Sequence, residues 1–191
     1  NYCPQSRPES LVAQITENKP TVNLMLPVKS KNFEFLRGHY EALADLAAYA
    51  ELYTFSDPAS SLVKLRTFTE LLVKNIYKHA DLKSEPGSKL NDLLRTQNFE
   101  DIIPEKVRLK LNSLRDNGNK AAHGKTVKPR TALWVLSETY DIARWFAKTY
   151  LELDSVPTTE YQAPVQGEEE TDSKAQLKRK NKELIQRLAK L

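Results

Sequence analysis

The chain has 191 residues, of which 40% are apolar, and this length is enough for one domain of ordinary size plus terminal segments. Its formal net charge of +4 is mild, so it permits nucleic acid or an acidic partner without demanding either. A single cysteine, Cys3, excludes an internal disulfide framework and is typical of the reducing cytoplasm, where we expect the protein. No apolar run is long enough to cross a membrane, so no membrane partner is predicted.

Residues 1–31 are predicted to form an extended arm, because prolines interrupt any helix there. A first helix is predicted over residues 32–55, where apolar side chains recur at helical spacing and Ser30 or Asn32 can cap the first turn. A second helix is predicted over residues 59–80. Asp57 can cap it, and Pro58 suits the first helical position because its missing N–H would be unpaired anyway.

Three further helices are predicted from the same spacing, over residues 88–99, 104–117 and 129–153. Ser88 is expected to cap the first of them, and Pro104 stands at the start of the second. Gly118 is expected to end that second helix, because glycine accepts the left-handed backbone that closes many helices. No segment alternates with a period of two, so the sequence predicts an all-α bundle of about five core helices over residues 32–152.

The composition changes after the last of these helices. Residues 153–172 contain prolines and an acidic run and are predicted to be a linker. Residues 173–191 place leucines seven residues apart, which predicts a basic, coiled-coil-like helix that continues in a longer parent chain. Its cations favour a solvated helix face, with contact to DNA phosphates as the alternative; they include Lys178, Arg179, Lys180 and Lys182.

The segment "DNGNKAAHGKT", residues 116–126, raises the question of a nucleotide site. A phosphate-binding loop needs four residues between its first glycine and Gly-Lys-Ser/Thr, but five separate Gly118 from Gly124. A helix rather than a buried strand precedes the segment, which also disfavours that loop. His123 and Asn119 therefore remain as the residues of interest here.

Five segments in this order resemble the N-terminal helical region of the R (motor and nuclease) subunit of type I restriction enzymes: "NFEFL", "DPASSLVKLRTFTELLVKNIY", "LNDLLR", "IPEKVRLKLNSLRDNGNKAAHG" and "ALWVLSETYDIARWFAKTY". The resemblance covers about residues 32–152. It implies that the parent chain is an ATP-dependent type I site-specific deoxyribonuclease that uses ATP and magnesium. It also implies methyltransferase and specificity subunits as partners. No cofactor is expected in this region itself.

The same helices resemble the HEPN superfamily, many members of which carry Arg-Asn-x-x-x-His as a metal-independent ribonuclease site in paired subunits. Asn119 and His123 match the last two residues of that motif, but Gly118 occupies the arginine position. The nearest arginine, Arg115, lies three residues earlier. A guanidinium would stabilise the charge on a transition-state phosphate, so its loss from the motif disfavours ribonuclease activity. For His123 we therefore favour a structural contact at a helix start over acid–base catalysis.

Other residues carry two interpretations each. Lys64, Arg66 and Glu70 could form surface salt bridges along one helix, or Arg66 could be buried and hold Glu70 or the turn at 116–123. Lys120 belongs to the same group of structural or interaction residues. No metal site is predicted, because the three histidines lie far apart without a cysteine or carboxylate cluster.

Two tryptophans of the 129–153 helix are candidates for a docking patch. Trp134 and Trp145 are expected to point to opposite sides of the helix, with at least one of them exposed.

The sequence leaves two functions open. The first is a non-catalytic interaction module that docks the restriction motor subunit onto its partner subunits or onto DNA, with self-association possible. The second is an active or degenerate HEPN nuclease of the toxin or abortive-infection kind. Gly118 in the place of arginine favours the first.

Overall fold

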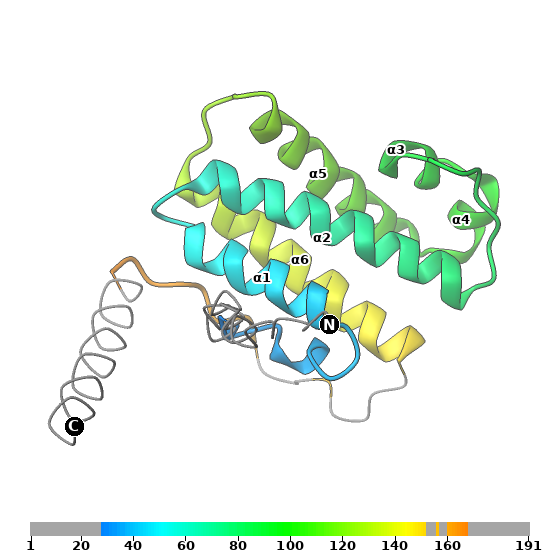
Figure 1. Cartoon of the computed structure of the whole chain (residues 1–191), viewed down its shortest axis with the longest axis horizontal. Helices are drawn as coiled ribbons and strands as arrows, with labels where there is room; N and C mark the ends of the chain where they lie inside the picture. The colour runs from blue at the N-terminus through cyan, green and yellow to red at the C-terminus, as the bar shows by residue number, and fades with distance from the viewer. Residues whose placement is uncertain (1–27, 152–155, 157–159, 168–191) are drawn as a thin grey trace, which may run out of the picture.

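The computed structural model describes residues 28–151, residue 156 and residues 160–167. Four long helices lie side by side in it: α1 (Glu41–Tyr53), α2 (Pro58–His79), α5 (Glu105–Ala122) and α6 (Pro129–Tyr150) (Figure 1). Three short elements complete the described part: η1 (Glu34–Leu36), α3 (Leu90–Leu93) and α4 (Gln97–Ile102). The described residues contain no strand, so the prediction of an all-α bundle is confirmed. Among them, no helix combines the length and apolar character that a bilayer span needs.

Helix α2 is the centre of the bundle, because it packs against α1, α5 and α6. Its predicted apolar stripe is buried, from Leu62 through Phe68 to Tyr77. The rings of Phe33, Phe68 and Tyr140 meet edge to face in the core, with centroids 5.9 Å apart for the first pair and 5.7 Å for Phe33 and Tyr140. The core therefore joins the segment before α1 to α2, which carries Phe68, and to α6, which carries Tyr140.

The start of α2 forms as predicted. Asp57 accepts a hydrogen bond from the backbone N–H of Ser60 at 3.1 Å, and Pro58 occupies the first helical position. The first predicted helix is different, since residues 32–55 form the short η1 and then, after a turn, α1. Ser30 accepts the N–H of Phe33 at 2.8 Å, while Arg37 pairs with Asp45 on α1 at 2.7 Å across the turn.

The predicted helix over residues 88–99 is also divided. It forms α3 and α4 with a turn between them, and the Ser88 hydroxyl donates to the carbonyl of Glu85 at 2.7 Å instead of capping a helix. The turn is held by the hydroxyl of Tyr77, which donates to the carbonyl of Leu93 at 2.7 Å and contacts Thr96. A tertiary contact from α2 thus ends α3 at a point where the local spacing favours a continuous helix.

The prediction that Gly118 ends a helix is wrong. Helix α5 continues through Gly118 to Ala122, and it ends where Gly124 adopts φ of +73°. The N–H groups of Gly124 and Lys125 each donate at 3.0 Å to carbonyls of the last turn, those of Ala121 and Lys120. Gly118 has another role: a Cβ there would lie 2.4 Å from the Cβ of Arg66 and 3.0 Å from the carbonyl oxygen of Leu62. Helices α2 and α5 approach closely because residue 118 has no side chain.

Part of the predicted linker packs against the bundle. Gln162 donates its N–H to the side-chain oxygen of Asn32 at 2.8 Å, and the amide of Asn32 donates back to the carbonyl of Gln162 at 2.9 Å. Tyr161 packs against Tyr140, with the ring centroids 5.7 Å apart. The boundaries predicted for the linker, the arm and the tail stay predictions, and most of the arm and all of residues 173–191 lie outside the described residues.

One carboxylate organises these terminal segments. Glu51 of α1 is 8% exposed and accepts hydrogen bonds from the Lys31 N–H at 2.9 Å and from the Asn32 amide at 2.7 Å. Burial raises the pKa of the Glu51 carboxyl and outweighs these donors, which act to lower it. Burial, and then the charge of Glu51, also raise the pKa of the nearby Tyr161 hydroxyl.

Replacing Gly118→Ala should lower the free energy of unfolding by about 1–3 kcal/mol, because the added methyl group forces α2 and α5 apart. Urea denaturation followed by circular dichroism measures the change. Gly38→Ala is the matched control, since nothing lies within 4 Å of a Cβ at that position. Equal stability of the two variants would contradict the close approach.

Glu51→Gln should change how stability depends on pH. Because the pKa of Glu51 is raised in the folded protein, its contribution is greatest below the unfolded pKa of about 4.3 and is lost as pH rises through the folded value. The stability of wild type minus that of Glu51→Gln should therefore fall as the pH rises above the unfolded pKa of about 4.3 and passes through the higher folded pKa. Asp57→Asn is the control, and its stability difference from wild type should change with pH in the opposite direction, because hydrogen bonds from Ser60 lower the pKa of Asp57. A Glu51 difference that stays constant with pH would contradict the burial argument.

Candidate functional site at the seam between α2 and α5

The close approach at Gly118 brings Arg66 of α2 alongside the next turn of α5. The Nε of Arg66 donates to the side-chain oxygen of Asn119 at 2.6 Å. Of the interpretations open for Arg66, the structure thus has the one that ties it to the 116–123 segment, although that segment is helix up to Ala122 rather than turn. Glu70, one turn along α2, instead accepts from Lys74 at 2.8 Å.

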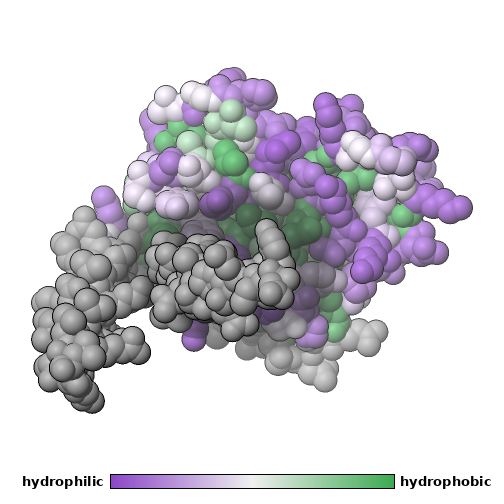
Figure 2. All heavy atoms as spheres, in the orientation of Figure 1, coloured by the Kyte–Doolittle hydropathy of each residue, from purple (hydrophilic) through white to green (hydrophobic). Residues whose placement is uncertain are grey.

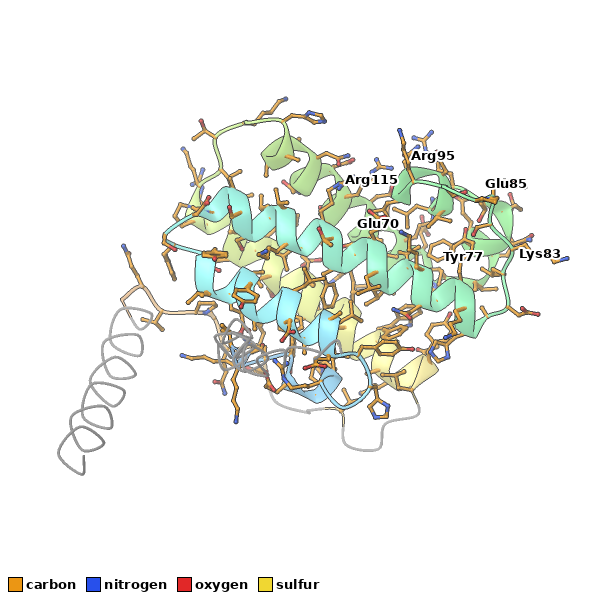
Figure 3. The ribbon with its side chains drawn as sticks, in the orientation of Figure 1. Glu70, Tyr77, Lys83, Glu85, Arg95 and Arg115 are labelled. Atoms are coloured by element: carbon orange, nitrogen blue, oxygen red, sulfur yellow. The ribbon has the colours of Figure 1, made fainter. Side chains whose placement is uncertain are left out.

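Arg115 lies one turn before Asn119 and is also engaged within the bundle. Its guanidinium donates to Asp116 on the same helix, with Nη2 2.7 Å from the carboxylate, and Nη1 donates to the side-chain oxygen of Asn91 on α3. Figure 3 shows Arg115 facing the same side of the bundle as Glu70 of α2. Arg115, the arginine nearest to Asn119 and His123, is therefore hydrogen-bonded to α3 through Asn91, which lies 24 positions earlier in the sequence.

His123 is placed differently from the sequence-based expectation. It is the residue directly after α5, so it lies at a helix end rather than a helix start, and its side chain is exposed. It has no hydrogen bond to Asn119 through its side chain; the bond between them joins the N–H of His123 to the Asn119 carbonyl at 3.0 Å. Lys120, in the last turn, is likewise exposed.

The three catalytic candidates are spread along the C-terminal part of α5 and just past its end. Arg115, Asn119 and His123 follow one another at intervals of four residues, each step rising about 6 Å along the helix. The Cα positions of Arg115 and His123 are thus about 12 Å apart along the axis. The side-chain oxygen of Asn119 between them is used by Arg66. Within the described residues, no group of three or more His, Cys, Asp or Glu side chains is arranged to hold a metal ion.

The remaining candidates are spread over other surfaces. Lys64 places its ammonium 5.5 Å from the centre of the Tyr49 ring, an arrangement that suits a cation–π contact. Trp134 is 48% exposed, whereas Trp145 is half-buried and packs edge to face on Tyr150 at 5.7 Å. The expectation that the tryptophans point to opposite sides is wrong, because eleven residues are about three helical turns and return to the same side. The basic tail residues lie outside the described part of the chain.

Sequence reasoning missed two partners of this seam. Asn91 contacts Arg115 from α3, and Asp116 pairs with it from the next position. An Asp directly after an Arg gives little warning of a pair, because neighbouring helical residues rarely face each other. Nothing in the spacing of residues 88–99 marks Asn91, because its contact depends on how the short helix packs.

Asn119→Ala should destabilise the protein by about 1–2 kcal/mol, because the half-buried Arg66 Nε loses its acceptor. His123→Ala should change stability by no more than about 0.5 kcal/mol, because that side chain is exposed. Chemical denaturation of both variants compares a residue that accepts a hydrogen bond from another helix with a residue whose side chain is exposed. A larger loss for His123→Ala than for Asn119→Ala would contradict these assignments.

Comparison with known proteins relates this bundle to a restriction system. Over 141 residues the chain is 26% identical to the type I restriction enzyme EcoKI endonuclease subunit of Escherichia coli (strain K12). The aligned part is 74% of this chain but 12% of that subunit, so the chain spans about an eighth of its relative. No solved structure matches the chain. The family described as a domain of unknown function (DUF4145) matches residues 48–187, which is more than half of the sequence, and the chain therefore belongs to the DUF4145 family.

Proposed function

We propose that this region is a non-catalytic interaction module of the R subunit of a type I restriction enzyme. It docks the ATP-dependent translocase and endonuclease onto the methyltransferase and specificity subunits or onto DNA. Its similarity to part of the EcoKI endonuclease subunit supports the restriction context. ATP and magnesium belong, in this proposal, to other parts of the parent enzyme, which acts in the cytoplasm.

One observation carries the non-catalytic part of the proposal. Two of the three catalytic candidates are committed to contacts inside the bundle: Asn119 accepts from Arg66, and Arg115 donates to Asn91 and Asp116. The contacts with Arg66 and with Asn91 join α5 to α2 and to α3, which is a structural use of the polar residues. His123 alone projects into solvent and has no acid–base partner among the described residues.

The alternative is a HEPN-type ribonuclease, or a degenerate nuclease of that kind. It is favoured by one observation, namely that Arg115 and Asn119 lie one turn apart on α5 and His123 directly follows its last residue, where a second subunit could bring further groups to them. A general acid–base pair must lie within hydrogen-bond reach of the same phosphodiester. Within one chain the spacing along α5 does not provide this, so the alternative needs a paired subunit.

Trp134 is the side chain that we assign to docking. It is 48% exposed on α6, and tryptophan is among the residues that contribute most to protein–protein binding when a partner covers them. About half of this large apolar side chain is open to solvent near the start of α6, where a partner could cover it.

The proposal predicts direct binding between the immobilised chain and the methyltransferase–specificity complex of its own restriction system. Trp134→Ala should weaken that binding about thirtyfold, because losing a central aromatic anchor typically costs about 2 kcal/mol or more. Biolayer interferometry measures the affinity, and circular dichroism verifies the fold. Val63→Ser is the matched control, because Val63 is 36% exposed on a different helix.

The same samples distinguish the other outcomes. Binding to duplex DNA that disappears with added salt, with no binding to the subunits, would move the docking role to DNA. Cleavage of single-stranded RNA that His123→Ala abolishes would establish the ribonuclease and overturn the proposal. Binding to neither partner would also overturn it.

A further inference from the structure

A groove of about 700 Å³ opens beside the Arg66–Asn119 contact. It lies between the second half of α2, the loop over residues 82–89 and α3. Figure 3 shows Glu70 and Tyr77 on the α2 side of this region, and Glu85 on the loop. Its volume falls within the range of about 300–1,000 Å³ that is usual for small-molecule sites.

The groove carries a surplus of positive charge. Four cations line it, Arg66, Lys74, Lys78 and Lys89, against the two carboxylates of Glu70 and Glu85, which leaves a net charge of +2. Lys74 and Glu70 neutralise each other at 2.8 Å. Lys78 and Lys89 form no ion pair with any described residue. Hydrophilic side chains also gather over this end of the bundle in the space-filling view (Figure 2).

Arg66 is the inner, pre-positioned cation of the groove. Its stem packs against Gly118, and its Nε is fixed by Asn119, so the guanidinium plane is held before any ligand arrives. The two Nη groups donate to no described residue. A guanidinium held in this way suits two oxygens of a phosphate. Binding would cost little further side-chain entropy, because Arg66 is already ordered.

The groove has an apolar lining of Leu82, Leu90, Leu93 and the ring of Tyr77. Leu82 is half-buried, whereas the other three are buried in the core beneath it. Tyr77 is fixed by the hydrogen bond from its hydroxyl to the Leu93 carbonyl and by stacking on Phe99 at 5.4 Å. An apolar lining beside a cationic fork matches a ligand with both a flat apolar part and an anionic part.

We propose that this groove binds a nucleotide, with Arg66 holding a phosphate, Lys78 and Lys89 adding positive charge further along the groove, and the base lying against the apolar lining at Leu82 and Pro86. A phosphate offers three acceptor oxygens and up to two negative charges, so it suits a guanidinium fork in a groove of net positive charge better than a carboxylate, which has two oxygens and one charge. The nucleotide is either free or part of a single strand, and the experiment separates these sources. The inference is independent of docking through Trp134.

The test is isothermal titration calorimetry, which measures the affinity of the full 191-residue chain for each of four probes. The probes are ADP, a single-stranded dT hexamer, inorganic phosphate and hexaglutamate. ADP or the hexamer should bind more tightly than the other two probes. Binding should weaken with added salt, because the contacting charges are partly exposed. The tighter of the two nucleotide probes identifies the free or the strand-borne source.

Lys78→Glu should weaken nucleotide binding about tenfold, because it reverses a charge that lines the groove. Lys83→Glu is the matched control, with the same charge change on the loop but outside the groove lining, and it should weaken binding less than about twofold. Glu85→Gln should strengthen binding, because it removes the unpaired carboxylate at the rim. Arg66→Lys should weaken it severalfold at unchanged net charge, with the thermal melt reporting any loss of fold.

Several results would overturn the assignment. They are no binding of ADP or the hexamer at millimolar concentration, tighter binding of hexaglutamate or of phosphate alone, and equal effects of Lys78→Glu and Lys83→Glu. Tighter hexaglutamate binding would instead identify the groove as a site for an acidic peptide.

Discussion

The close approach of α2 and α5 at Gly118 is the constraint on which the rest of the structure depends. The backbone of α5 lies so near the stem of Arg66 that a single methyl group has no room. This proximity sets Arg66 against Asn119, which fixes the relative position of the two helices along their length. Helix α2 in turn contacts every other long helix, so an error at this seam would spread through the bundle.

A second, smaller set of polar contacts joins the ends of the described chain to the bundle. Glu51, buried on α1, holds the backbone and side chain of the segment before η1, and Asn32 of that segment holds Gln162. Two stretches 130 residues apart in sequence are thereby tied to one carboxylate. Because burial raises the pKa of Glu51, this junction is sensitive to the ionisation of a group that lies far from the seam.

The polar motif that draws attention in the sequence is used for architecture. Asn119 and Arg115 each serve a neighbouring helix, and His123 lies past the end of α5 in solvent. Chemistry by Asn119 or Arg115 would require them to leave those contacts, and a binding role elsewhere on the surface does not. The proposed binding roles use other surfaces, one around Trp134 and one at the groove beside Arg66.

The sequence by itself determined the all-α class, the long helices and their buried stripes, because these follow from apolar spacing, which is a local property. It also determined the start of α2, where Asp57 and Pro58 act within one turn. Only the tertiary structure decided that Gly118 allows α2 and α5 to pack closely and does not end a helix. Both roles depend on the absence of a side chain, so they can be told apart only when the neighbouring helix is known. The tertiary structure likewise decided the break between α3 and α4 and the partners of Arg66, Arg115 and Asn32. Those contacts join residues many positions apart in the sequence. The local spacing of apolar residues cannot predict them, because they form only when the helices pack together.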